Sequence, residues 1–172
     1  MFEIHEMRDE NISVNNINLH IKTAGDINND VIIFLHGFPE FWYGWKNQIP
    51  FFVENDYYVV VPDLRGYNLS SKPKRVKDYV VEESTLDIAL LIQKLNKKKV
   101  ILVGHDWGGV VAWRLAMEYP ELIQKLILLN IPHPQIVLQY IKTHPVQMLK
   151  SSYIAFFQLP IIPEIDITIV QF

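Results

Sequence analysis

The hydrophobic positions along the chain fall into short runs that predict β-strands. Ile12–Thr23 alternates apolar and polar residues with one slip, which indicates a strand with one buried face. Val31–Leu35 is apolar throughout and rich in β-branched residues, a pattern typical of a strand covered on both faces. Tyr57–Val61, Val100–Val103 and Lys125–Leu129 have the same character. They predict three further buried strands.

Two longer segments between these runs have helical spacing. Apolar residues recur every three or four positions in Glu82–Asn96 and in Gly109–Tyr119, and Pro120 ends the second segment. Strands that alternate with helices indicate βαβ units, hence a mostly parallel sheet with helices on both faces. Functional groups of such folds gather at the carboxyl ends of the strands. The sequence therefore predicts an α/β protein with its site at that edge of the sheet.

Composition narrows the class of protein. The chain has 172 residues, of which 49% are hydrophobic and 20% charged, so it can bury a core and is not a disordered protein. The net charge of −3 lacks the basic footprint of a nucleic-acid binder. The chain contains 0 cysteines, which excludes disulfides, thiolate metal sites and a cysteine nucleophile.

The sequence gives no sign of a leader or a membrane span. Met1–Glu10 has no apolar signal-peptide core. The longest apolar stretches, Val31–Leu35 and Tyr153–Ile162, are shorter than the ~18 residues that a spanning helix needs. We therefore expect a cytoplasmic protein in a reducing compartment.

The strongest chemical signal is Gly104-His105-Asp106-Trp107-Gly108-Gly109, between a predicted strand and a predicted helix. This is the context of a nucleophile elbow, the G-x-S-x-G turn, with Asp106 in the place of serine. Such a turn raises the nucleophile above the sheet in a strained conformation, and small flanking residues let the two backbones approach. The helix N-terminus favours the negative charge that develops there. The alternative is that Asp106 only caps the helix.

A second signal, His36-Gly37-Phe38-Pro39, directly follows the strand Val31–Leu35. A glycine turn at a strand end can aim a backbone N–H into the site, where it would form an oxyanion hole with the N–H of Trp107. The alternative is an ordinary turn between a strand and a helix. Two such motifs at two strand ends favour the catalytic interpretation.

Together the motifs closely resemble those of α/β-hydrolase-fold epoxide hydrolases, from about Ile12 to Pro160. The matching residues are His36-Gly37-Phe38-Pro39-Glu40 with Trp42 and Trp45, Asp63-Leu64-Arg65-Gly66-Tyr67 with Ser71-Lys72-Pro73, and the elbow. The resemblance implies that Asp106 is the nucleophile and that the backbone N–H groups of Phe38 and Trp107 form the oxyanion hole. It further implies that His36, Gly37, Pro39 and Trp42 belong to the loop beside the substrate pocket, with His36 pointing into the support layer. Asp63 and Arg65 are expected to fix backbone, and His105 to point into the layer beneath the elbow.

The resemblance also implies a reaction without a cofactor or a metal ion. An aspartate attacks a small-molecule epoxide and forms an alkyl ester, which water then hydrolyses to the diol. Cap-domain tyrosines of the family polarise the epoxide oxygen, and Tyr153 matches the first of them. The alternative for Tyr153 is an aromatic residue of an amphipathic cap helix. No two histidines have metal-ligand spacing beside a carboxylate.

Neighbouring subfamilies differ at particular positions. Haloalkane dehalogenases usually carry a halide-binding asparagine where this chain has Phe38. Fluoroacetate-type dehalogenases usually carry an arginine where Trp107 stands. Both differences favour the epoxide hydrolase, and a haloalkane dehalogenase-like hydrolase is the alternative.

The chain lacks matches for the rest of the family's triad, because it reaches only the start of the expected cap at Phe172. After Asp106 the sequence has two histidines. His133 resembles part of a structural loop, and His144 lies on the expected cap linker. We therefore expect residues 1–133 to be the N-terminal part of the hydrolase core and residues 134–172 the start of a truncated helical cap.

The segment Glu164–Phe172 alternates with period two and predicts a strand where the family's cap is helical. A truncated or split coding sequence would explain this. Three hypotheses follow: an enzyme half that is active with a complementing C-terminal fragment, an inactive remnant or single-turnover trap, and a non-catalytic half that binds another chain through its open sheet edge.

Overall fold

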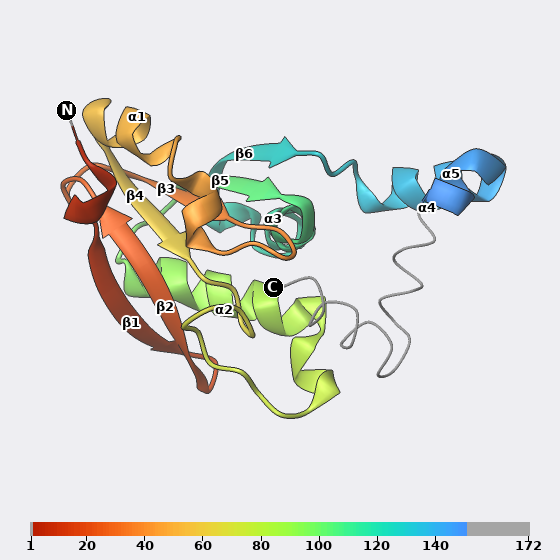
Figure 1. Ribbon diagram of the computed structural model, residues 1–172, viewed down its shortest axis with the longest axis horizontal. Coiled ribbons are helices and arrows are strands. Elements are labelled where there is room, and N and C mark those ends of the chain that lie inside the picture. The colour runs from red at the N-terminus through yellow and green to blue at the C-terminus, as the bar shows by residue number, and fades with distance from the viewer. Residues whose placement is uncertain (1, 151–172) are drawn as a thin grey trace, which may run out of the picture. The chain divides into compact units, whose positions relative to one another are not determined.

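The computed structural model describes residues 2–150 and contains six strands (Figure 1). The strands are β1 (Arg8–Val14), β2 (Ile17–Ala24), β3 (Asp30–Leu35), β4 (Tyr57–Pro62), β5 (Val100–His105) and β6 (Ile123–Leu129). They form one sheet in the order β1-β2-β4-β3-β5-β6. The pairs β1–β2 and β2–β4 are antiparallel, whereas β4, β3, β5 and β6 run parallel. This confirms the predicted mostly parallel sheet.

The helices follow the strands in the predicted alternation. They are α1 (Ile49–Glu54), α2 (Val81–Lys94), α3 (Asp106–Glu118), α4 (Pro134–Thr143) and α5 (Pro145–Lys150). The described residues also form four 3₁₀ turns, η1 (Ile4–Glu6), η2 (Trp42–Trp45), η3 (Val76–Tyr79) and η4 (Pro120–Leu122). Among the described residues, none of these helices is long and apolar enough to cross a membrane.

Both faces of the central strands are buried, as their unbroken apolar sequence predicts. In β3, Val31, Ile33 and Leu35 pack into a cluster that α2 and α3 cover. The alternate residues Ile32 and Phe34 pack on the opposite face, against η2 and α1. Figure 1 shows α1 and α2 on opposite sides of the strands. The helices therefore cover both faces of the sheet.

The prediction of a single strand over Ile12–Thr23 was wrong, because this segment is the hairpin of β1 and β2. Val14 pairs with Ile17, so the turn consists of Asn15 and Asn16, with φ of 40° and 60°. Two residues at positive φ match the twist of a tight hairpin, and asparagine tolerates that conformation. The slip in the alternation marks this turn.

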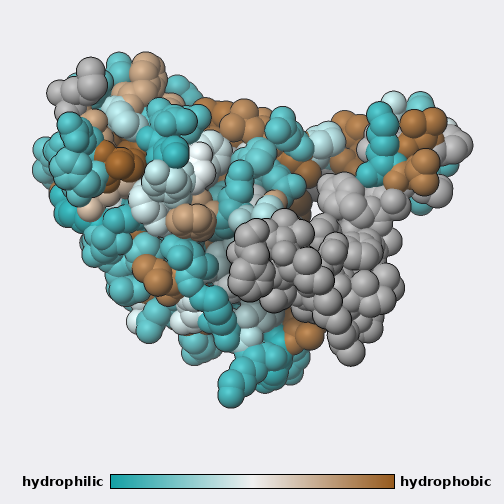
Figure 2. All heavy atoms as spheres, viewed as in Figure 1, coloured by the Kyte–Doolittle hydropathy of each residue, from teal (hydrophilic) through white to brown (hydrophobic). Residues whose placement is uncertain are grey.

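The prediction that Lys125–Leu129 is buried was wrong in part. β6 has β5 as its neighbour and lies at the end of the described sheet. Leu126 and Leu128 pack against the core, but Ile127 and Leu129 are 41% and 42% exposed. Figure 2 shows hydrophobic surface along this strand, at the upper margin of the view.

The chain divides into two compact units, Met1–Ile131 and Pro132–Phe172. The sheet, α1, α2 and α3 belong to the first unit, and α4 and α5 to the second. The assignment of 1–133 as hydrolase core and 134–172 as cap stays a prediction. The predicted strand Glu164–Phe172 lies outside the described residues.

Candidate active site

Asp106 occupies a strained turn between β5 and α3. Its φ is +47°, the left-handed region that non-glycine residues rarely adopt. The N-cap of α3 is His105, and Asp106 is the first residue of the helix. The alternative that Asp106 is only the N-cap therefore does not describe this turn. A strained residue that its surroundings hold in place is typical of a functional site.

The turn depends on the absence of side chains at two glycines. A Cβ on Gly108 would lie 2.4 Å from the carbonyl oxygen of Leu35 and 2.5 Å from that of His36. A Cβ on Gly37 would lie 2.6 Å from the Cβ of Asp106. The elbow and the loop after β3 therefore meet at a distance that only glycine permits.

The loop after β3 aims a donor at the nucleophile. The backbone N–H of Phe38 donates to Oδ1 of Asp106 over 3.0 Å. Phe38 and Pro39 are joined by a cis peptide bond, and both residues are exposed. Trp107 follows Asp106 and packs its partly buried side chain against the core that includes α3. The structure thus brings Phe38, Gly37 and Asp106 together, and the role of the Trp107 N–H stays a prediction.

His36 supports this loop from beneath. It is fully buried, its Nδ1 donates to the carbonyl oxygen of Gly37 over 2.9 Å, and its Nε2 accepts from the N–H of Leu64 over 3.0 Å. Burial lowers the pKa of His36, against the smaller opposing effects of the Gly37 bond and nearby carboxylates. A neutral ring fits both bonds, because Nε2 accepts only when it carries no proton.

The prediction that His105 points into the layer beneath the elbow stays a prediction, and the ring of this histidine lies near Glu40, Asn130 and the buried Trp45. Its Nδ1 lies 3.2 Å from Oε2 of Glu40, and its Nε2 lies 3.4 Å from Nδ2 of Asn130. The same Glu40 oxygen accepts from the N–H of Gly37 over 3.3 Å. The side chain of His105 turns toward the partly exposed Glu40, because a carboxylate pairs better with imidazole than the apolar core does.

Sequence reasoning also missed Tyr67, whose ring lies edge-on to His36 with 4.8 Å between centroids. Burial, followed by the negative charge of Asp106, raises the pKa of Tyr67 to about 12. Tyr67 is therefore a neutral phenol beside the elbow at neutral pH. Its place at the end of the matched segment Asp63–Tyr67 was the available signal.

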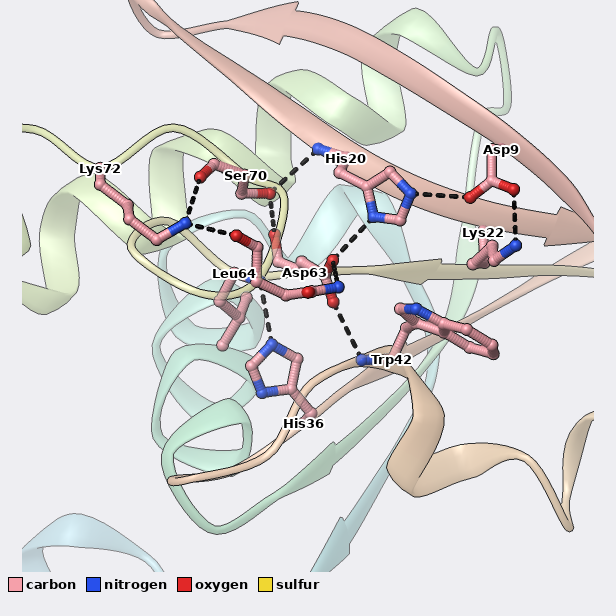
Figure 3. Close-up of polar contacts among 10 residues, drawn as sticks. Asp9, His20, Lys22, His36, Trp42, Asp63, Leu64, Ser70 and Lys72 are labelled. Carbon is pink, nitrogen blue, oxygen red and sulfur yellow. Dashed lines mark hydrogen bonds and ion pairs between the residues drawn. The ribbon is translucent and has the colours of Figure 1, made fainter. Parts of the chain in front are cut away.

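Asp63 and Arg65 fix backbone, as the resemblance implies. Oδ1 of Asp63 accepts from the N–H of Trp42 over 3.0 Å. Arg65 makes two bonds of 2.7 Å to the buried carboxylate of Asp87 and one of 2.6 Å to the carbonyl oxygen of Asp78. The partly buried indole of Trp42 lies 4.9 Å below the ammonium of Lys22, beside the β1–β2 hairpin (Figure 3).

The remaining predicted residues belong to the second unit. Nδ1 of His133 accepts from the N–H of Gln135 at the start of α4, and His144 stacks on Tyr140 with 3.8 Å between centroids. Tyr153 lies outside the described residues. Within residues 2–150, no group of three or more histidine, aspartate and glutamate side chains is placed to hold a metal ion.

The fold and the elbow define an α/β hydrolase, and the comparison with known families agrees. The alpha/beta hydrolase fold family matches residues 30–160, so the chain belongs to that family. Within it, the chain is 52% identical over 153 residues to the AB hydrolase superfamily protein YfhM of Bacillus subtilis, covering 89% of this chain and 54% of the relative. It is 43% identical over 156 residues to human Epoxide hydrolase 4, covering 91% of this chain and 43% of the relative.

Solved structures give the same result. An epoxide hydrolase of Vigna radiata superposes with a TM-score of 0.81 at 34% identity, over 93% of this chain and 50% of that chain. A mutant epoxide hydrolase from Bacillus megaterium gives 0.83 at 40% identity, over 88% and 52%. These findings confirm the resemblance to epoxide hydrolases. The chain spans about half the length of the curated relatives it matches.

Proposed function

We propose that this chain carries the nucleophile half of an epoxide hydrolase. A carboxylate oxygen of Asp106 attacks the less hindered epoxide carbon, the C–O bond of the ring breaks, and the ring oxygen leaves as an alkoxide that takes a proton from a donor. The product of this step is an alkyl ester on Asp106. The observation that supports the proposal is the strained Asp106 with the Phe38 N–H on its carboxylate.

The second step of the reaction would again use the backbone N–H of Phe38. Water attacks the carbonyl carbon of the aspartyl ester, and the negative oxygen of the tetrahedral intermediate is stabilised by the N–H groups of Phe38 and Trp107. Loss of one such donor typically raises the barrier by about 2.7–4 kcal/mol. Tyr153, by the resemblance, would donate the proton to the opening epoxide.

Hydrolysis of the ester needs a base that activates water. The two histidines that follow Asp106 in the chain, His133 and His144, make the local contacts described above. The isolated chain would therefore form the ester faster than it hydrolyses it. It would act as a single-turnover trap for epoxides.

Intact-mass spectrometry of the chain after incubation with an aryl epoxide tests this proposal. The expected result is one added epoxide mass in the wild type and none in Asp106→Asn. Asp56→Asn is a matched control, because Asp56 is also an aspartate at positive φ, 61°, but is exposed. An adduct that persists in Asp106→Asn, or the absence of any adduct in the wild type, would refute the assignment.

The haloalkane dehalogenase alternative is tested in the same assay. A bromoalkane would give the same ester with release of bromide, and faster labelling by the bromoalkane than by the epoxide would favour that alternative. The position at which this chain differs from haloalkane dehalogenases is Phe38, whose N–H donates to Asp106.

The complementing-half hypothesis concerns the edge strand β6, where Ile127 and Leu129 are exposed. The relatives are about twice as long as this chain. We expect co-expression with the C-terminal part of such a relative to give multiple turnovers of epoxide to diol. If the ester forms but no diol accumulates in the co-expressed pair, the complementation hypothesis is wrong and the trap remains.

A further inference from the structure

The loop that carries the Phe38 N–H is held at both ends by two consecutive residues. At its start, the N–H of Leu64 donates to Nε2 of His36 over 3.0 Å. At its end, Oδ1 of Asp63 accepts from the N–H of Trp42 over 3.0 Å. Figure 3 shows both bonds converging on the segment after β4. The position of Phe38 therefore depends on how firmly Asp63 is held.

Asp63 is a fully buried carboxylate, so it needs partners that compensate for its lost hydration. Its Oδ2 accepts from Nδ1 of His20 over 2.7 Å and from Nδ2 of Asn68 over 2.8 Å. The hydroxyl of Ser70 donates to the Asp63 carbonyl oxygen over 2.6 Å and accepts from the His20 N–H over 2.9 Å. Among these partners, His20 is the one that can supply a positive charge.

The ring of His20, 3% exposed, is bracketed by carboxylates. Its Nε2 lies 2.9 Å from Oδ1 of Asp9, on the opposite side from Asp63. Carboxylate oxygens only accept, so both bonds form when both ring nitrogens carry protons. The ammonium of Lys22 lies 2.6 Å from the other oxygen of Asp9.

Two carboxylates contact the ring of His20: that of Asp63, from the segment after β4, and that of Asp9 from β1, with Lys22 of β2 behind Asp9. These contacts join Asp63, His20, Asp9 and Lys22 in one chain of polar groups (Figure 3). Charge-assisted bonds of this kind are roughly twice as strong as neutral ones.

From this geometry we infer that His20 is a positioning residue for the oxyanion donor. Its bond to Oδ2 fixes the Asp63 carboxylate, Asp63 fixes Trp42, and the loop between His36 and Trp42 then holds the Phe38 N–H on Asp106. The β1–β2 hairpin thus contributes to the position of this loop through His20. The proposal builds on the proposed function only where it refers to the Asp106 reaction.

Amide signals of the full chain test the inference without any epoxide. Labelling with ¹⁵N-tryptophan reports on four residues, and Trp42→Phe identifies the signal of Trp42. In His20→Gln, which keeps a donor but cannot bridge both carboxylates with one rigid ring, we expect the Trp42 amide signal to shift and its hydrogen exchange to be about tenfold faster.

Two variants control for a general loss of structure. Asp9→Asn keeps an acceptor for Nε2 and removes only the charge of a residue whose side chain is 60% exposed, so exchange at Trp42 should change by less than about twofold. His5→Gln removes an exposed histidine that pairs with Glu3 and should change nothing. An unshifted Trp42 amide signal in His20→Gln, or wild-type protection of that amide in the same variant, would overturn the inference.

The rate of ester formation on Asp106 adds a functional readout. We expect this rate to be about tenfold lower in His20→Gln than in Asp9→Asn, matching the tenfold faster exchange of the Trp42 amide. Equal rates in these two variants would show that the loop does not depend on His20. If the wild type forms no ester, the proposed function fails, while the amide measurements still decide on His20.

Discussion

The effect of a side chain at Gly108 on stability follows from the distances between this residue and the end of β3. In Gly108→Ala, the new Cβ would lie 2.4 Å from the Leu35 carbonyl oxygen and 2.5 Å from that of His36. Ordinary contacts begin near 3.4 Å, so α3 must move away by about 1 Å. Both obstacles are backbone atoms, one at the end of the buried strand β3 and one in the residue that follows it, and they cannot turn aside as a side chain can. Overpacking of this kind typically costs about 1–3 kcal/mol, and we expect the upper end of that range.

The same displacement should reach the nucleophile two residues earlier. Moving the start of α3 by about 1 Å would stretch the 3.0 Å bond from the Phe38 N–H to Asp106 beyond hydrogen-bonding distance. Ester formation on Asp106 should therefore slow by more than the loss of folded protein explains.

Urea denaturation followed by tryptophan fluorescence measures the effect on stability. With a slope of about 2 kcal/mol per molar urea, a loss of about 3 kcal/mol lowers the midpoint by about 1.5 M. Gly44→Ala is the matched control, because its Cβ would meet only the Glu40 side chain, at 3.6 Å. Equal midpoints for the two variants would refute the reasoning.

Three further predictions rest on other parts of the fold. Burial lowers the pKa of His36, so the unfolded chain takes up a proton at a higher pH than the folded one. The free energy of unfolding should therefore fall as the pH drops below about 6.5, by up to about 1.4 kcal/mol per pH unit. In His36→Gln, the urea midpoint should depend less steeply on pH than in the wild type. Asp87→Ala leaves the Arg65 charge buried without its carboxylate and should lower the free energy of unfolding by about 3–5 kcal/mol. The double variant Asp87→Leu with Arg65→Met should regain much of that stability in thermal unfolding. A double variant as unstable as the single one would contradict this. Asn16→Ala should destabilise the hairpin turn by about 1 kcal/mol because Asn16 has φ of 60°, and Asn16→Gly should not, as measured by midpoint differences between the two variants.

The sequence predicts the central sheet because its strands are buried on both faces. A run such as Val31–Leu35 can be satisfied only between two layers, so its pattern is independent of which helices cover it. Edge strands lack this constraint. β6 has an apolar sequence but one described neighbour, and in the β1–β2 hairpin a single slip in the alternation, at Asn15 and Asn16, marks the turn. The apolar pattern by itself therefore does not separate an edge strand or a hairpin from a central strand.

The candidate site divides in the same way. The elbow and the glycine loop are local, because a strand, a turn and the start of a helix lie within one short segment. The bonds from Glu40 to His105 and from Asp63 to His20 join residues 65 and 43 positions apart in the chain. No spacing rule covers such distances, so these partners emerge only from the fold. The sequence offered only Glu40 and Asp63, each within a matched motif, as signals of these contacts.

The strain at Asp106 bears on what this half of the site can do by itself. A non-glycine residue at φ of +47° persists only where its surroundings oppose relaxation. Here the opposing groups are the Gly108 contact with β3, the close approach of Gly37, and the Phe38 N–H, and all belong to Met1–Ile131. These contacts, which hold Asp106 at positive φ, therefore lie within the first unit. Hydrolysis of the ester needs, in addition, a base that activates water. In the proposed reaction the nucleophile Asp106 thus belongs to the first unit, whereas the described contacts of Asp106 do not include such a base.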